Sequence, residues 1–117
     1  MITVLCVDDH RLMREGITYI LGMHPDIRVI GEASTGEEAV ALHERLRPDV
    51  TLMDLQLPGM NGLEATRAIR RRDPAARIVV LTMYQGDEDI YGAIQAGAAG
   101  YVLKDSVSSE LLRIIRN

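Results

Sequence analysis

Five short apolar segments rich in β-branched residues alternate with segments of helical periodicity, and this alternation strongly constrains the fold. The apolar segments span residues 2–7, 27–33, 50–54, 78–83 and 100–103. None of them alternates polar and apolar side chains cleanly, so each is expected to be buried on both faces, as in a parallel sheet. Strands and helices that alternate at this spacing predict a doubly wound α/β domain. We expect a five-stranded parallel sheet in the order 2-1-3-4-5, covered by five helices.

Residues that favour helix ends lie between the predicted strands and helices. Thr35 with Glu38 and Asn61 with Glu64 have the spacing of a capping box. In this motif the side chain of each of the two residues accepts a hydrogen bond from the backbone amide of the other. Ser108 is placed to cap the last helix. These signals predict helices that begin shortly after residues 35, 61 and 108.

Length, charge and cysteine content limit the class of protein. A chain of 117 residues fits one domain, and its net charge of −4 argues against direct binding to nucleic acid. No targeting segment and no apolar stretch of about 20 residues is visible. Cys6 has no disulfide partner and lies in an apolar run, so we expect it to be buried in a protein of a reducing, cytoplasmic compartment. The last helical pattern reaches Asn117, which suggests a domain cut from a longer chain.

Polar side chains stand where four of the predicted strands end. Asp8 and Asp9 follow the first strand, Asp54 ends the third, Thr82 lies at the end of the fourth and Lys104 follows the fifth. Each alone has an ordinary explanation as a turn, a helix cap, a strand residue or a surface lysine. Because all carboxyl ends of a doubly wound sheet lie at one edge, their joint placement favours a ligand site there.

Three close carboxylates need positive charge nearby, since like charges raise one another's pKa. Lys104 is one candidate cation, and oxygen-only ligands favour Mg²⁺ as another. The backbone carbonyl of Gln56, just beyond the third strand, could complete the metal's ligand set. His10, His24 and His43 show no transition-metal spacing, so we expect them to be solvated or to act as helix caps.

The motifs "VDDH", "LMDLQLPGMNG", "VLTM" and "GYVLKD" occur in this order. Together they closely resemble the receiver domain of two-component response regulators, over nearly the whole chain. The residues within these motifs are most similar to those of the NarL/FixJ subgroup, whose output domains are of the LuxR type. The resemblance implies a flavodoxin-like receiver domain over residues 1–117 that is usually followed by a helix-turn-helix DNA-binding domain.

The resemblance also implies a role for each acidic residue. Asp54 would accept a phosphoryl group from a phosphohistidine of a sensor histidine kinase. Asp8, Asp9, Asp54 and the carbonyl of Gln56 would hold Mg²⁺. The chain would then be a signalling domain and not an enzyme in the ordinary sense, since it would catalyse only its own phosphorylation and dephosphorylation.

The switch residues are implied in the same way. Lys104 would pair with the phosphoryl oxygens, Thr82 would donate its hydroxyl to one of them, and Tyr101 would swing inward behind Thr82. The output surface would comprise the fourth helix, the fifth strand and the fifth helix, including Ile90, Tyr91 and Arg113. The implied partners are the kinase, a possible second copy of the chain, and DNA only through the absent domain, with no membrane contact.

Other classes fit the sequence less well. A haloacid-dehalogenase-type phosphatase would need a second aspartate where Gln56 stands, and a flavodoxin-like binding module would need a Ser/Thr-rich loop in place of "DDHR". A degenerate receiver that works by interaction alone is disfavoured by the intact Asp, Thr and Lys set. Gln56 and Tyr84 flank the expected path of attacking water, so the lifetime of the phosphorylated state stays open.

Overall fold

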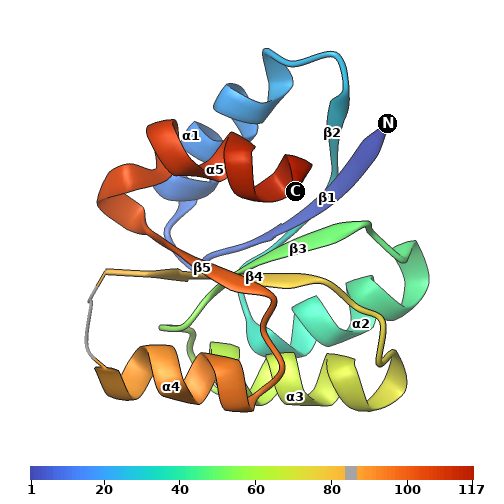
Figure 1. The fold of residues 1–117 in the computed structure, drawn as a ribbon. Coiled ribbons are helices and arrows are strands. Elements are labelled where there is room, and N and C mark those ends of the chain that lie inside the picture. The colour runs from blue at the N-terminus through green and yellow to red at the C-terminus, as the bar shows by residue number, and fades with distance from the viewer. Residues whose placement is uncertain (84–86) are drawn as a thin grey trace.

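The computed structural model describes residues 1–83 and 87–117, with only the backbone described at 87–89. The five strands form a single parallel sheet in the predicted order, β2-β1-β3-β4-β5 (Figure 1). The strands are β1 (Ile2–Val7), β2 (Ile27–Ala33), β3 (Val50–Asp54), β4 (Ile78–Thr82) and β5 (Gly100–Leu103). β4 is one residue shorter than predicted, because its pairing with β5 ends at Thr82 and Leu103.

Helices cover both faces of the sheet, as the alternation of strands and helices predicts (Figure 1). α1 and α5 lie on one face, and α2, α3 and α4 lie on the other. The helices are α1 (Arg11–Gly22), α2 (Gly36–Leu46), α3 (Gly62–Arg72), α4 (Asp87–Gln95) and α5 (Val107–Arg116), with a 3₁₀ turn, η1 (Lys104–Ser106), before α5.

The inner strands β3 and β4, and β1 from Val4 onward, are buried on both faces, which explains why their sequences do not alternate. The expectation of burial on both faces is wrong for the edge strands β2 and β5, which carry exposed residues. Along β1, Val4 and Cys6 pack in the core beneath α1 and α5. Leu5 and Val7 pack in the core beneath α2 and α3. All five residues of β3 and all five of β4 are buried. The sheet therefore places the strand ends firmly, and with them the polar side chains at its edge.

Of the three predicted helix caps, one is confirmed in full, one in part, and one is wrong. Asn61 and Glu64 form a complete capping box at the start of α3. Thr35 accepts a hydrogen bond from the Glu38 amide at the start of α2, while the Glu38 carboxylate bonds Ser34 instead of closing the box. The prediction that Ser108 caps the last helix is wrong. α5 already begins one residue earlier, directly after η1.

Burial of Val107 explains the early start of α5. Val107 is 7% exposed and belongs to the core under α1 and α5, and its backbone is already helical. Ser106 occupies the cap position without a side-chain hydrogen bond. The packing of Val107 in the core thus outweighs the capping preference of Ser108 in deciding where the helix begins.

Two further sequence expectations concern buried side chains. Cys6 is fully buried, as predicted. His43 was expected to be solvated or to act as a cap, but it is buried on the inner side of α2. Burial lowers the pKa of His43 because it disfavours the charged imidazolium. No helix in residues 1–83 or 87–117 is both long and apolar enough to cross a membrane.

Candidate functional site

Asp8 and Asp54 lie side by side at the carboxyl edge of the sheet. Val7 and Met53 are paired in the register of β1 and β3, so the residue that follows each lies at the same edge. Both carboxylates are fully buried. Asp9, next in the chain, is partly exposed. The predicted convergence of three carboxylates is therefore present, with two of them inside the protein and one at its rim.

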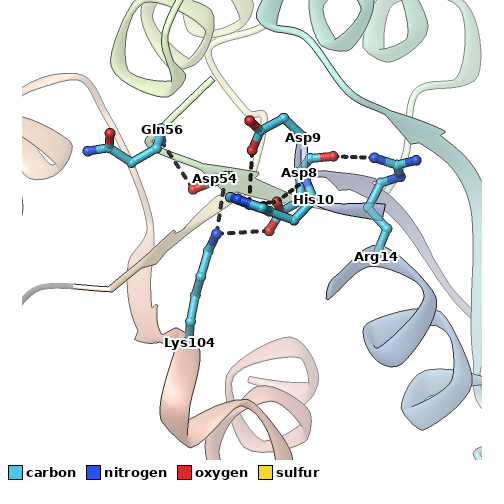
Figure 2. Close-up of polar contacts among 7 residues, drawn as sticks. All are labelled: Asp8, Asp9, His10, Arg14, Asp54, Gln56 and Lys104. Carbon is cyan, nitrogen blue, oxygen red and sulfur yellow. Dashed lines mark hydrogen bonds and ion pairs between the residues drawn. The ribbon is translucent and has the colours of Figure 1, made fainter. Parts of the chain in front are cut away.

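Lys104 reaches this pair of carboxylates from the end of β5 (Figure 2). Its Nζ lies 3.0 Å from Asp8 Oδ2 and 3.1 Å from Asp54 Oδ2, and the side chain is only 7% exposed. These contacts raise the pKa of Lys104 despite the opposing effect of burial. The ammonium is thus held charged between the two buried acids, as the sequence analysis predicted.

The surroundings of Asp54 disfavour the ionised form of its carboxyl group. Burial, followed by the nearby charge of Asp8, raises the pKa of Asp54 to about 6. The Gln56 backbone amide, which donates to Asp54 Oδ1 at 3.1 Å, and Lys104 oppose this rise. A carboxylate that is desolvated yet ionised near neutral pH has a suitable environment for a nucleophile. The Gln56 side chain itself is exposed.

The carboxylates fit a hard divalent cation. Within the described residues, Asp8 Oδ2 and Asp54 Oδ2 have no well-directed hydrogen bond and are compensated by the Lys104 ion pairs. One ammonium does not balance three carboxylates. Ligand atoms of Asp8, Asp9, His10 and Asp54 all lie within 4.8 Å of one another. Carboxylate oxygens at this density match the preference of Mg²⁺.

Two residues at this edge contact the aspartates, which the sequence analysis did not predict, although His10 is exposed and lies at the start of α1 as expected. The His10 Nδ1 lies 3.2 Å from Asp8 Oδ1 and 3.1 Å from Asp9 Oδ1 (Figure 2). Its position directly after two aspartates was a usable signal. The Arg14 guanidinium donates to the backbone carbonyl of Asp8 from the first turns of α1. No sequence pattern considered above pointed to it.

Thr82 and Tyr101 occupy different positions relative to the acids. Thr82 is the buried last residue of β4, one residue beyond the pairing of Leu81 with Asp54, so it lies at the site's edge. Tyr101 pairs with Val80 from β5, the edge strand of the sheet, and is 43% exposed. The predicted set therefore divides into a cluster at the sheet edge and one exposed tyrosine on β5. Tyr84 lies outside the described residues.

Gly62 brings the start of α3 against the backbone of Asp54. A Cβ at Gly62 would lie 2.1 Å from the Asp54 carbonyl oxygen and 2.7 Å from Leu55 Cα. The Gly62 amide also donates to the Leu55 carbonyl at 3.1 Å. This close approach fixes the backbone of the turn that leaves β3 directly after Asp54.

A doubly wound domain with a buried aspartate pair and a lysine at the carboxyl edge is the architecture of a receiver domain. The family model of the response regulator receiver domain matches residues 4–116. The chain belongs to this family. Membership favours a phosphorylated signalling switch over the phosphatase and the flavodoxin-like binding module.

Relatives narrow the subgroup. The chain is 44% identical over 113 residues to the nitrate/nitrite response regulator protein NarL of Escherichia coli strain K12, covering 97% of this chain and 52% of that protein. It is 48% identical over 116 residues to the transcriptional regulatory protein LiaR of Bacillus subtilis strain 168, covering 99% and 55%. The chain thus spans about half the length of these curated relatives.

Solved structures agree in fold. A two-component response regulator of the LuxR family from Aurantimonas sp. SI85-9A1 superposes with a TM-score of 0.94 at 43% identity, over 99% of this chain and 83% of that one. The signal receiver domain of the putative response regulator NarL from Mycobacterium tuberculosis gives 0.90 at 33% identity, over 99% and 97%. The chain is therefore a receiver domain of the NarL/LuxR type.

Proposed function

We propose that Asp54 is the phosphoacceptor of this receiver domain. The observation that carries the proposal is the buried Asp54 carboxylate, with its pKa raised to about 6 and Lys104 Nζ 3.1 Å away. A buried carboxylate is a better nucleophile than a solvated one. The Lys104 ammonium is close enough to neutralise the charge of the incoming phosphoryl oxygens.

The residues that would hold Mg²⁺ are Asp8, Asp9, Asp54 and the backbone carbonyl of Gln56. The buried Oδ2 atoms of Asp8 and Asp54, which have no well-directed hydrogen bond and share the Lys104 ammonium, support this assignment. The bound cation would supply positive charge toward the phosphoryl oxygens in the transition state. Asp54 has to serve both as a ligand and as the nucleophile, which its two oxygens allow.

The proposed reaction moves one phosphoryl group without other chemistry. An Asp54 oxygen attacks the phosphorus of a phosphohistidine on a sensor histidine kinase, so an O–P bond forms while the N–P bond breaks. The kinase imidazole leaves with the electron pair of the broken bond. Lys104 then pairs with the phosphoryl oxygens, and the Thr82 hydroxyl donates to one of them. Attack of water on phosphorus later releases inorganic phosphate and restores the Asp54 carboxylate.

The new charge is the signal. A phosphoryl group adds roughly −1.5 to −2 charges at pH 7 by analogy with other phosphoresidues. Such a charge biases a two-state element, which we assign to Thr82 and Tyr101. In this structure Tyr101 is exposed on β5, from where an inward rotation would change the surface of α4, β5 and α5.

The whole protein is proposed to be longer than this chain. Residues 1–117 form its receiver domain, and the coverage of its relatives leaves room for a C-terminal helix-turn-helix domain that binds DNA. The chain is proposed to act in the cytoplasm, with a sensor histidine kinase and, in the phosphorylated state, a second copy of the chain as its partners.

Intact-mass measurement after incubation with acetyl phosphate tests the proposal. We expect one added phosphoryl group, which requires Mg²⁺ and is absent from Asp54→Asn. Asp105→Asn is a matched control, because this exposed carboxylate stands next to Lys104 in the chain. An adduct that persists in Asp54→Asn, or forms equally well with chelator, would contradict the assignment.

A further inference from the structure

The His10 ring lies at the outer rim of the acidic pocket, where the proposed function leaves it without a task. Its Nδ1 is 3.2 Å from Asp8 Oδ1 and 3.1 Å from Asp9 Oδ1 (Figure 2). The His10 backbone amide also donates to Asp8 Oδ1 at 2.8 Å, which holds the residue close to the acid. Three consecutive residues therefore each offer a potential ligand atom, and these atoms lie within 4.8 Å of one another.

The separations match those of ligands around one small cation. Zn²⁺ binds imidazole nitrogen and carboxylate oxygen at about 2.0–2.2 Å in tetrahedral geometry, so two of its ligand atoms lie roughly 3.4 Å apart. The observed separations of 3.1 and 3.2 Å from His10 Nδ1 are close to this value. Replacing the hydrogen bonds by metal–ligand bonds would require only small movements of the side chains.

Lys104 does not occupy this position. Its ammonium faces Oδ2 of Asp8 and of Asp54, whereas His10 faces Oδ1 of Asp8. Asp8 is fully buried, and its Oδ2 has no well-directed hydrogen bond within the described residues. The His10 side chain is 63% exposed, so an ion arriving from solvent can reach it.

The type of ligand atom decides which of two cations this pocket prefers. Carboxylate, carbonyl and water oxygens suit Mg²⁺, while an imidazole among the ligands suits Zn²⁺. We propose that His10 adds a nitrogen ligand to Asp8 and Asp9 and makes this pocket a Zn²⁺ site in competition with Mg²⁺. The proposal rests on the metal pocket of the proposed function and assigns to His10 the choice between cations.

Calorimetric titration of the chain with Zn²⁺ and separately with Mg²⁺ tests this assignment. In His10→Ala and His10→Gln, Zn²⁺ affinity should fall by about tenfold or more, the scale expected when a metal site loses a partner group. Mg²⁺ affinity should change by less than about twofold, since oxygen ligands remain. The glutamine variant keeps hydrogen-bonding capacity, so an equal loss there assigns the effect to the imidazole.

His24→Ala serves as the matched control, because this histidine contacts Arg116 and not the acids. It should leave both affinities unchanged. Nitrogen chemical shifts of the His10 ring should also move on addition of Zn²⁺ and stay in place on addition of Mg²⁺.

Equal losses of both cations in His10→Ala, or no loss of Zn²⁺, would overturn the proposal. The two proposals fail separately. A chain that bound Zn²⁺ through His10 but took no phosphoryl group on Asp54 would contradict the proposed function alone. Normal phosphorylation with Zn²⁺ binding insensitive to His10 would contradict only this inference.

Discussion

The Arg14 guanidinium donates a hydrogen bond to the backbone carbonyl of Asp8, with 2.6 Å between Nη1 and the oxygen. Its Nε donates to Glu32 Oε1 at 3.3 Å, and the side chain is only 18% exposed. Arg14 therefore ties the loop that carries Asp8 and Asp9 to both α1 and β2. We expect Arg14→Ala to weaken Mg²⁺ binding by about tenfold, because residues that orient metal ligands have effects of this size.

Mg²⁺ titration followed by calorimetry measures this effect, and thermal unfolding in chelator shows whether the fold persists. Arg11→Ala is the control on the same helix, since Arg11 is exposed and pairs only with Glu15 among the described contacts. Arg14→Lys should recover part of the affinity. Unchanged Mg²⁺ binding in Arg14→Ala would show that the loop needs no such brace.

Removal of the Asp54 charge should stabilise the fold above pH 6. A carboxyl group whose pKa is raised on folding, here to about 6, stabilises the fold while protonated. This contribution is lost as the pH rises from about 4 through about 6. The unfolding free energy of Asp54→Asn minus that of the unmodified chain should therefore grow over this range, by up to about 3 kcal/mol. Urea unfolding in chelator at a series of pH values measures it.

Asp49→Asn provides a control of opposite sign. The Asp49 carboxylate accepts hydrogen bonds from the Thr3 amide and hydroxyl, which hold its pKa below the usual range. Its stabilisation is present above about pH 4 and is lost as the pH falls. If both variants showed the same pH trend, the raised pKa of Asp54 would be refuted.

Gly62→Ala should be strongly destabilising, because the added Cβ would lie 2.1 Å from the Asp54 carbonyl oxygen. Overpacking against backbone costs about 3 kcal/mol when the chain has to shift. Gly16→Ala is the matched control within α1, where a Cβ meets nothing within 4 Å. It should stabilise by about 0.5–1 kcal/mol, since alanine is the better helix former. Two urea denaturation curves decide between these signs.

Tyr101→Ala should uncouple the proposed phosphorylation from the surface of α4, β5 and α5. The side chain is 43% exposed, so its removal should cost less than about 1 kcal/mol of stability. Hydrogen exchange of α4, β5 and α5 with and without acetyl phosphate measures the response. Tyr19→Ala, on exposed α1 surface, should respond as the unmodified chain does. A full response in Tyr101→Ala would remove the switch role.

The sheet edge could be predicted from the sequence because parallel topology brings strand ends together whatever their side chains do. Asp8 and Lys104 directly follow strands and Asp54 ends one, so a correct strand order was enough to place them in contact. Asn61 and Glu64 were predictable for a related reason, since a capping box involves residues only three apart.

The remaining features depend on packing that local patterns do not carry. Ser108 is a good capping residue, but the burial of Val107 starts α5 earlier. His43 is buried by the packing of α2, which a lone histidine in the sequence does not reveal. The contact of Arg14 with the Asp8 carbonyl requires the direction of α1 relative to β1, and this follows only from the assembled sheet.

The single cysteine of the chain, Cys6, is fully buried on β1, and burial raises the pKa of its thiol to about 12. The thiolate is the form that reacts with alkylating reagents. The folded chain is therefore inert toward maleimide labelling at neutral pH without any change to Cys6. One cysteine introduced on exposed α1, for example by Tyr19→Cys, would carry a fluorophore at a single defined position.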